Sequence, residues 1–97
     1  MTTEDIQKFP PKDVNDRLDE TFSFSGMRLA ATETLEQPVV TAVPAGLTIS
    51  DPQVQGQKVV VIVGGGEVGV TYTLTCEVDT SLGKHINRKA LLSVGDL

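Results

Sequence analysis

The chain has few of the side chains on which sites in small proteins are usually built. Its 97 residues include one cysteine, one histidine, three phenylalanines, one tyrosine and no tryptophan. A single cysteine excludes an internal disulfide, and a single histidine argues against a structural zinc site. With so few aromatic residues, a buried core must consist mostly of valine, leucine and isoleucine. We therefore expect neither a metal nor a disulfide in the fold.

Basic residues and long apolar runs are also scarce. Eight basic side chains against 13 acidic ones give a net charge of −5, so the concentrated basic face of a nucleic-acid-binding protein is missing. No apolar run is long enough to span a membrane, and residues 1–12 lack the apolar core of a signal peptide. The length suits one domain. We expect no nucleic acid or membrane partner, and synthesis in a cytoplasm.

A glycine-rich segment matches the sequence motif of dinucleotide-binding loops. The apolar run of residues 59–63 leads into a G-x-G-x-x-G motif between Gly64 and Gly69. In a dinucleotide-binding fold, such glycines let the backbone approach a pyrophosphate at the N-terminus of a helix. A nucleotide-binding enzyme is therefore one hypothesis for this chain, and it requires a helix after Gly69.

The residues after the loop favour a strand instead. From Val70 to Asp79, apolar or aromatic residues occupy every even position and polar residues every odd one. This period of two, together with many β-branched residues, is typical of a half-buried strand. The glycines are therefore predicted to join two strands, and the enzyme hypothesis becomes the weakest of the alternatives.

The rest of the chain predicts an all-β fold. Short alternating segments are separated by turn residues, a pattern typical of a sandwich or barrel. We predict an immunoglobulin-like β-sandwich of about seven short strands, with helix limited to a turn or two in residues 13–20. Its core should contain Tyr72, Leu74, Cys76 and Leu92. The Tyr72 hydroxyl then needs a hydrogen-bond partner, and the expected one is a backbone carbonyl near the preceding loop.

Residues 1–19 form a polar, charged segment that contains Pro10 and Pro11. Adjacent prolines favour an extended backbone, so we predict an extended N-terminal arm before a sandwich domain of residues 20–97. The arm has few apolar residues to give to a core, and we expect it to be dispensable for folding. It is either a disordered tail or a segment ordered against a neighbour, with Ile6 and Phe9 as apolar anchors.

No side chain in the sequence is placed like a catalytic group, which needs an activated nucleophile beside an oriented base. Cys76 falls on the inward face of its predicted strand, where a thiol behaves as a small apolar group with a raised pKa. His85 falls in a predicted turn, and Glu77 and Asp79 fall on an outer face, so all three should be solvated. The acidic cluster of residues 13–20 lacks the glycine and the closing glutamate of a calcium loop. We predict no catalytic residue, no cofactor and no metal.

Several short motifs, taken in order, resemble one family of tailed-phage proteins. They are residues 9–13 with the later Leu18-Asp19, the turn at residues 43–49, and the loop-to-strand segment 64–74. They match an F-P-P-K-D start followed by L-D, a V-P-A-G-L-T turn and a Gly-Gly-x-x-Gly-x-x-Tyr-Thr motif. The chain is therefore similar to small Ig-like proteins described as fibre–tail adaptors.

This resemblance implies a function that the residues alone do not. It implies a non-enzymatic virion protein of the tail, made in the host cytoplasm, that attaches fibres or spikes to the tail tube or nozzle, beside neighbouring copies of itself. It implies no cofactor. In the arm, Ile6, Phe9, Pro10, Pro11 and Lys12 would contact a partner by wrapping a neighbour or adding a strand to its sheet. The alternative is an Ig-like capsid decoration or accessory adhesion domain.

Three places depart from the family pattern. Phe24 stands where such proteins often have tryptophan, residues 35–41 match poorly, and the last strand lacks a large aromatic residue near Ala90. These departures bear on the details of packing and of any interface formed there more than on the family itself.

Overall fold

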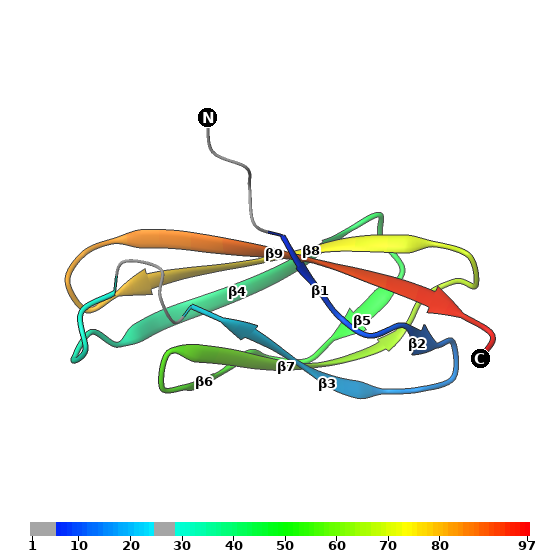
Figure 1. Cartoon of the computed structure of the whole chain (residues 1–97), viewed down its shortest axis with the longest axis horizontal. Coiled ribbons are helices and arrows are strands. Elements are labelled where there is room, and N and C mark those ends of the chain that lie inside the picture. Colours follow the sequence, from blue (N-terminus) through cyan, green and yellow to red (C-terminus); the bar gives the residue numbers. More distant parts are fainter. Residues whose placement is uncertain (1–5, 25–28) are drawn as a thin grey trace.

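The computed structural model describes residues 6–24 and 29–97, and every regular element within these ranges is a β-strand (Figure 1). These residues contain no helix, and so none that could cross a membrane. The strands are β1 (Gln7–Lys8), β2 (Lys12–Asp13), β3 (Leu18–Ser23), β4 (Leu35–Val43), β5 (Leu47–Ile49), β6 (Gln53–Gln55), β7 (Lys58–Gly65), β8 (Thr71–Thr80) and β9 (His85–Gly95). The predicted all-β class is confirmed, with nine strands in place of about seven.

The strands form two sheets that pack face to face. In the first sheet, β8 lies between β4 and β9 and is antiparallel to both, while the short β1 and β2 run parallel to β9 on its other side. In the second sheet, β7 is the central strand, with β3 on one side and β5 and β6 on the other. The ends of β2 and β9 therefore lie next to each other, close to the C-terminus (Figure 1).

Strand β8 shows why a period of two predicts a strand here. Its even residues Tyr72, Leu74, Cys76 and Val78 are buried, while the residues between them are partly exposed. Leu92 of β9 is also buried and lies directly opposite Tyr72. The glycine loop between β7 and β8 joins two strands, as predicted, and no helix follows it.

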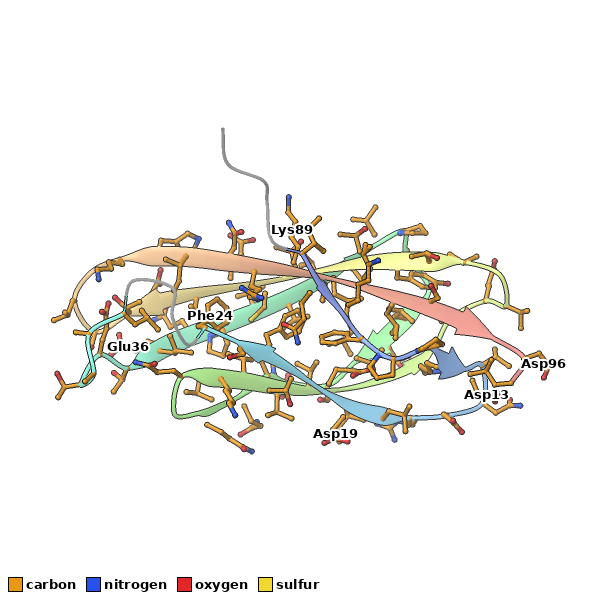
Figure 2. All side chains as sticks on the ribbon, viewed as in Figure 1. Asp13, Asp19, Phe24, Glu36, Lys89 and Asp96 are labelled. Carbon is orange, nitrogen blue, oxygen red and sulfur yellow. The ribbon has the colours of Figure 1, made fainter. Side chains whose placement is uncertain are left out.

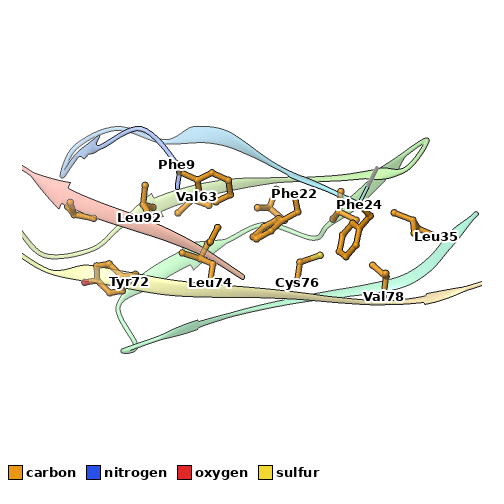
Figure 3. Close-up of a cluster of buried hydrophobic side chains, with 14 residues drawn as sticks. Phe9, Phe22, Phe24, Leu35, Val63, Tyr72, Leu74, Cys76, Val78 and Leu92 are labelled. Carbon is orange, nitrogen blue, oxygen red and sulfur yellow. The ribbon is translucent and has the colours of Figure 1, made fainter. Parts of the chain in front are cut away.

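The core lies between the two sheets and consists mainly of small aliphatic side chains (Figure 3). The inward valines of β7 face the buried residues of β8 and β9. The three phenylalanines are buried as well: Phe22 lies on β3, Phe24 directly after it, and Phe9 between β1 and β2. The rings of Phe9 and Phe22 meet edge to face with their centroids 5.3 Å apart, a favoured aromatic geometry.

The start of the chain differs from the expectation. Residues 13–20 contain no helical turn, but the end of β2, a turn and the start of β3. The arm is extended, yet β1 and β2 lie along β9, and the boundary predicted at Asp19 falls inside β3. Because Phe9 contributes to the core, we expect removal of the arm to destabilise the sandwich, contrary to the expectation that it is dispensable for folding.

Candidate functional site

The motif residues meet at one end of the sandwich, around Tyr72. The Tyr72 hydroxyl oxygen accepts a hydrogen bond from the backbone N–H of Glu67 at 2.9 Å. The sequence analysis predicts a backbone carbonyl as the partner of this hydroxyl, whereas the observed partner is a backbone N–H, so this part of the prediction is wrong. Gly46 and Gly66 lie against the ring, since an added Cβ would be 3.1 Å from the Tyr72 hydroxyl oxygen and 3.4 Å from its Cε1. Both glycines also have a positive φ, which other residues rarely adopt.

Backbone amides of the glycine loop have acceptors within the chain. The N–H of Gly66 donates to the carbonyl oxygen of Gly46 at 3.1 Å, and the N–H of Gly69 donates to that of Val94 at 2.9 Å. The N–H of Glu67 is the donor to Tyr72. A phosphate-binding loop needs such amides to be free. Here the loop instead connects the turn before β5 and the end of β9.

Lys12 is buried beside this loop. Its Nζ donates hydrogen bonds to the carbonyl oxygens of Asp13, Gly65 and Val14 at 2.7, 2.9 and 3.5 Å. An ammonium group has three donors, so these three oxygens use all of them. A buried charge without such partners would cost several kcal/mol. Lys12 therefore links the arm to the glycine loop, 53 residues later in the chain.

Asp13 connects the arm to the C-terminal end of the chain. Its carboxylate accepts hydrogen bonds from the backbone N–H groups of Asn15 and Leu97 at 2.9 and 2.8 Å. These two bonds, the one from Asn15 first, lower the pKa of the carboxyl group. Figure 2 shows Asp13 and Asp96 at the same end of the molecule. The F-P-P-K-D stretch thus fixes the protein's own fold, through Phe9 in the core as well as through Lys12 and Asp13.

The sulfur of Cys76 lies in the core, away from any base that could activate it. Burial, and secondarily the charge of Glu77, raises the pKa of the thiol to about 12. A thiol with such a pKa is protonated at neutral pH and is a poor nucleophile.

His85 is exposed but not simply solvated. Its Nδ1 lies 2.7 Å from a carboxylate oxygen of Asp79, and its Nε2 lies 3.0 Å from one of Glu77. These hydrogen bonds, the one to Asp79 first, raise the pKa of the imidazole. All three side chains face the solvent, as expected, but they also contact one another, and His85 is the first residue of β9 and not part of a turn. Within residues 6–24 and 29–97, no group of three histidine, cysteine or acidic side chains is arranged to hold a metal ion.

Two buried carboxyl groups were not foreseen. The side chain of Glu33 lies fully buried in the loop before β4, where Oε1 accepts from the N–H of Ala30 at 3.0 Å and pairs with Lys84 Nζ at 3.1 Å. Hydrogen bonds, the one from the Thr80 hydroxyl first, lower the pKa of Glu33. Nothing in the local sequence distinguishes this glutamate from a solvated one, because its partner Lys84 lies 51 residues away.

The second unforeseen group is Glu20, on the inward face of β3. It alternates with Phe22 and is almost wholly buried, whereas Asp19 points away from the sandwich (Figure 2). Burial, with a smaller contribution from the Asp19 charge, raises the pKa of Glu20 to about 7. The shared parity of Glu20 and Phe22 is the sequence signal that could have revealed this burial.

The two long sides of the first sheet differ in how they end. On one side, β1 and β2 pair with residues 90–91 and 94–95 of β9, and the Gln7 side chain donates to the carbonyl oxygen of Thr21 on β3 at 2.9 Å. We call this side the arm edge. On the other side, β4 is the last strand, and no strand in the described part of the chain pairs with its outer side. Residues 39–43 of β4 are here called the open edge.

The structure separates the five arm residues that were predicted to bind a partner. Phe9 and Lys12 are buried within the chain, so their side chains are not accessible to a partner in this structure. Ile6, Pro10 and Pro11 are exposed and lie on either side of Phe9. Of the five residues, Ile6, Pro10 and Pro11 are the ones whose side chains are exposed to a partner.

The described residues define a small β-sandwich whose polar clusters bond mainly to its own backbone and whose unpaired surface lies along strand edges. That is the architecture of a structural or binding module. The chain belongs to a phage protein family, since the family model described as podophage GP4 fiber-tail adaptor protein gp77 matches residues 12–93. It is therefore a bacteriophage tail protein of the fibre–tail adaptor kind, as its motifs predict. No curated protein matches the chain.

Proposed function

We propose that this chain is a non-enzymatic adaptor that attaches fibres or spikes to the tail tube or nozzle of the virion, beside neighbouring copies of itself. The observation that carries the proposal is the family match over residues 12–93. Two mainly antiparallel sheets packed face to face support an immunoglobulin-like sandwich as the folded unit. The protein would be made in the host cytoplasm and would need no cofactor.

The physical means of attachment would be several modest contacts in parallel. Copies arranged by the symmetry of a tail each contribute a small interface, and the combined attachment is much stronger than any single one. The net charge of −5 favours partners with basic surfaces. On this chain, the exposed Ile6, Pro10 and Pro11 offer an apolar patch on a backbone that is already extended, so little conformational entropy is lost on docking.

The adaptor role is tested by producing particles without this protein. We expect filled capsids with tails but without fibres, measured by quantitative mass spectrometry of purified particles. Supplying the protein in trans should restore the fibres. Particles that keep a full set of fibres in its absence would contradict the adaptor role.

The arm patch is tested by Ile6→Asp, with Leu82→Asp as the matched control on the exposed turn between β8 and β9. We expect Ile6→Asp to lower the incorporated copies about tenfold, because a charge in an apolar contact costs more than 1 kcal/mol. The control should incorporate normally. Equal incorporation of both variants would show that the arm patch makes no contact and that another surface attaches the protein.

The capsid decoration alternative predicts a different copy number. A decoration protein follows the capsid lattice, whereas an adaptor is present in a small multiple of the tail symmetry. Counting the copies per particle separates the two.

A further inference from the structure

The open edge is an uncharged strand edge with which no strand of residues 6–24 and 29–97 pairs on its outer side. In β4, Val39 and Val43 are 54% and 69% exposed, and Thr41 between them is exposed as well. No charged residue occurs from Gln37 to Ser50. Unpaired strand edges attract other strands, and natural proteins usually protect them with charged side chains, proline or bulges.

What protection exists is confined to the two ends of this segment. A bulge lies between Glu36 and Val39, and Gln37 has a φ of 49°. Pro38 and Pro44 stand directly before and after residues 39–43, and proline has no N–H to give to a neighbouring strand. Between them lie five residues, and alternate residues of a strand paired on one side direct their N–H and C=O groups away from the partner strand, here away from β8.

The sequence of this segment is nearly palindromic. Residues 38–44 read P-V-V-T-A-V-P, which is symmetric about Thr41 except that valine at 40 stands against alanine at 42. In an antiparallel pair of identical strands related by a twofold axis through Thr41, this near-symmetry places valine opposite valine and proline opposite proline.

We propose that β4 pairs antiparallel with β4 of a second copy of this chain, with the two Thr41 residues opposite each other. Val39 then faces Val43 of the second copy, and the prolines face each other at both ends. Apolar and threonine cross-strand pairs of this kind stabilise antiparallel sheets, and no charge stands opposite a like charge. The first sheets of the two copies become one continuous sheet.

Pairing through this edge stops at two copies. Each copy has one β4, and the proposed pair uses the unpaired side of both, so neither copy has a second β4 edge to offer. Two copies related by a twofold axis form a closed assembly, which removes the risk of an open-ended fibre. Val54 of β6, a strand that lies near β4, is also exposed.

The pair should be weak in solution. Five paired residues bury much less surface than a standard stable interface of about 1,600 Å². Two copies of net charge −5 also repel each other, and salt screens that repulsion. We therefore expect a dimer that forms at high protein concentration and strengthens with salt, and that the local concentration in a virion would favour.

This inference rests on the part of the proposed function in which copies of the chain contact one another. A chain that stays monomeric in solution could still join a fibre to a tail. The experiments below therefore test the β4 contact alone, separately from the loss of fibres in particles that lack the protein.

The first test is sedimentation of the full chain with charge variants at the centre of the proposed pair. Thr41→Lys and Thr41→Glu each place like charges opposite each other and should weaken self-association at least about tenfold. An equimolar mixture should form a mixed dimer. The matched control is Asn87→Lys, which puts the same charge on an exposed residue of the same sheet, two strands away from the edge. It should leave self-association within about twofold of the unchanged chain.

The second test fixes the register without relying on affinity. Thr41→Cys should form a disulfide between two copies under mild oxidation, because facing residues of an antiparallel pair have suitable Cα distances. The native thiol of Cys76 is buried and serves as the unreactive internal reference. Asn87→Cys should not cross-link.

Three outcomes would overturn the proposal. They are a full chain that remains monomeric at about 1 mM and high salt, a mixture of Thr41→Lys and Thr41→Glu that does not associate, and Thr41→Cys that cross-links no faster than Asn87→Cys. If the charge variants misfold, as judged by circular dichroism, the cross-linking rates decide. Association with a fibre protein through β4, without any self-association, would also contradict it.

Discussion

The arm edge and the open edge close the same sheet in opposite ways. At the arm edge, the chain covers β9 with its own β1 and β2, places Phe9 in the core and links Lys12 to the glycine loop. At the open edge, β4 exposes apolar side chains and no charge. The arm edge contributes contacts to the fold, whereas the outer side of β4 has no partner among the described strands. The proposed pairing would therefore give the two edges of one small protein separate tasks.

Removing the core contact of the arm edge should have the largest effect. Phe9→Ala deletes a buried ring that meets Phe22 and should lower the free energy of unfolding by about 3–4 kcal/mol. Ile6→Ala, on the exposed start of the same arm, should cost less than about 1 kcal/mol. Urea denaturation measures both. Equal stability of the two variants would mean that the arm does not pack on the sandwich.

Lys12 offers the next largest effect on the same edge. Lys12→Met keeps the length of the side chain but removes the donors to three carbonyl oxygens, so we expect a loss of about 2–3 kcal/mol. Lys8→Met, on the exposed part of β1, is the control and should change little. If Lys12→Met were as stable as the unchanged protein, the buried ammonium would not stabilise the contact between arm and loop.

The location of these residues shows how far the sequence alone could predict the fold. The period of two in residues 70–79 depends only on neighbouring residues, so it correctly predicted β8 and the inward positions of Tyr72 and Cys76. The glycine loop was also read correctly as a connection between strands. The burial of Lys12 and Glu33 could not be predicted, because their partners lie more than 50 residues away.

Distant pairing partners also explain why the burial of Phe9 and the contacts of His85 could not be predicted. The burial of Phe9 depends on parallel pairing with β9, about 80 residues later, which no local pattern encodes. The bridge from His85 to Glu77 and Asp79 depends on the register of β8 with β9. The family, in contrast, was readable from Gly46, Gly66 and Tyr72, because they belong to the motifs and pack together in the fold.

Glu20 makes the stability of the arm edge depend on pH. It lies on β3, which the arm contacts through Gln7. Its pKa is raised from 4.5 to about 7 in the folded state, so the folded protein holds this proton more tightly than the unfolded chain. The resulting stability is fully present below the unfolded pKa and is lost as the pH rises through about 7. We expect this contribution to the free energy of unfolding to be about 1–2 kcal/mol, less than the full pKa shift would give, because solvent reaches part of the carboxyl group and screens it.

The measurement is the free energy of unfolding of Glu20→Gln between about pH 4 and pH 8. The neutral amide should match the unchanged protein near pH 4 and exceed its stability by about 1–2 kcal/mol near pH 8. Asp16→Asn, on an exposed turn, serves as the control for the loss of one charge. A constant difference between Glu20→Gln and the parent across this range would show that Glu20 does not titrate near neutral pH.

The smallest effect on stability is expected at the open edge. Thr41 is exposed and β4 pairs on one side only, so Thr41→Lys should change the unfolding free energy of the dilute monomer by less than about 0.5 kcal/mol. A loss above about 2 kcal/mol would mean that Thr41 supports the fold, and the two edges would then not differ in task.

Amide hydrogen exchange of the full chain at low and high protein concentration tests the contrast between the two edges most directly. We expect the amides of β9 that face β1 and β2 to be equally protected at both concentrations, because their partners belong to the same chain. The amides within residues 39–43 that point away from β8 should exchange several-fold more slowly at high concentration, and this slowing should disappear in Thr41→Lys. Exchange in β4 that is independent of concentration, or protection of β9 that depends on it, would contradict the account.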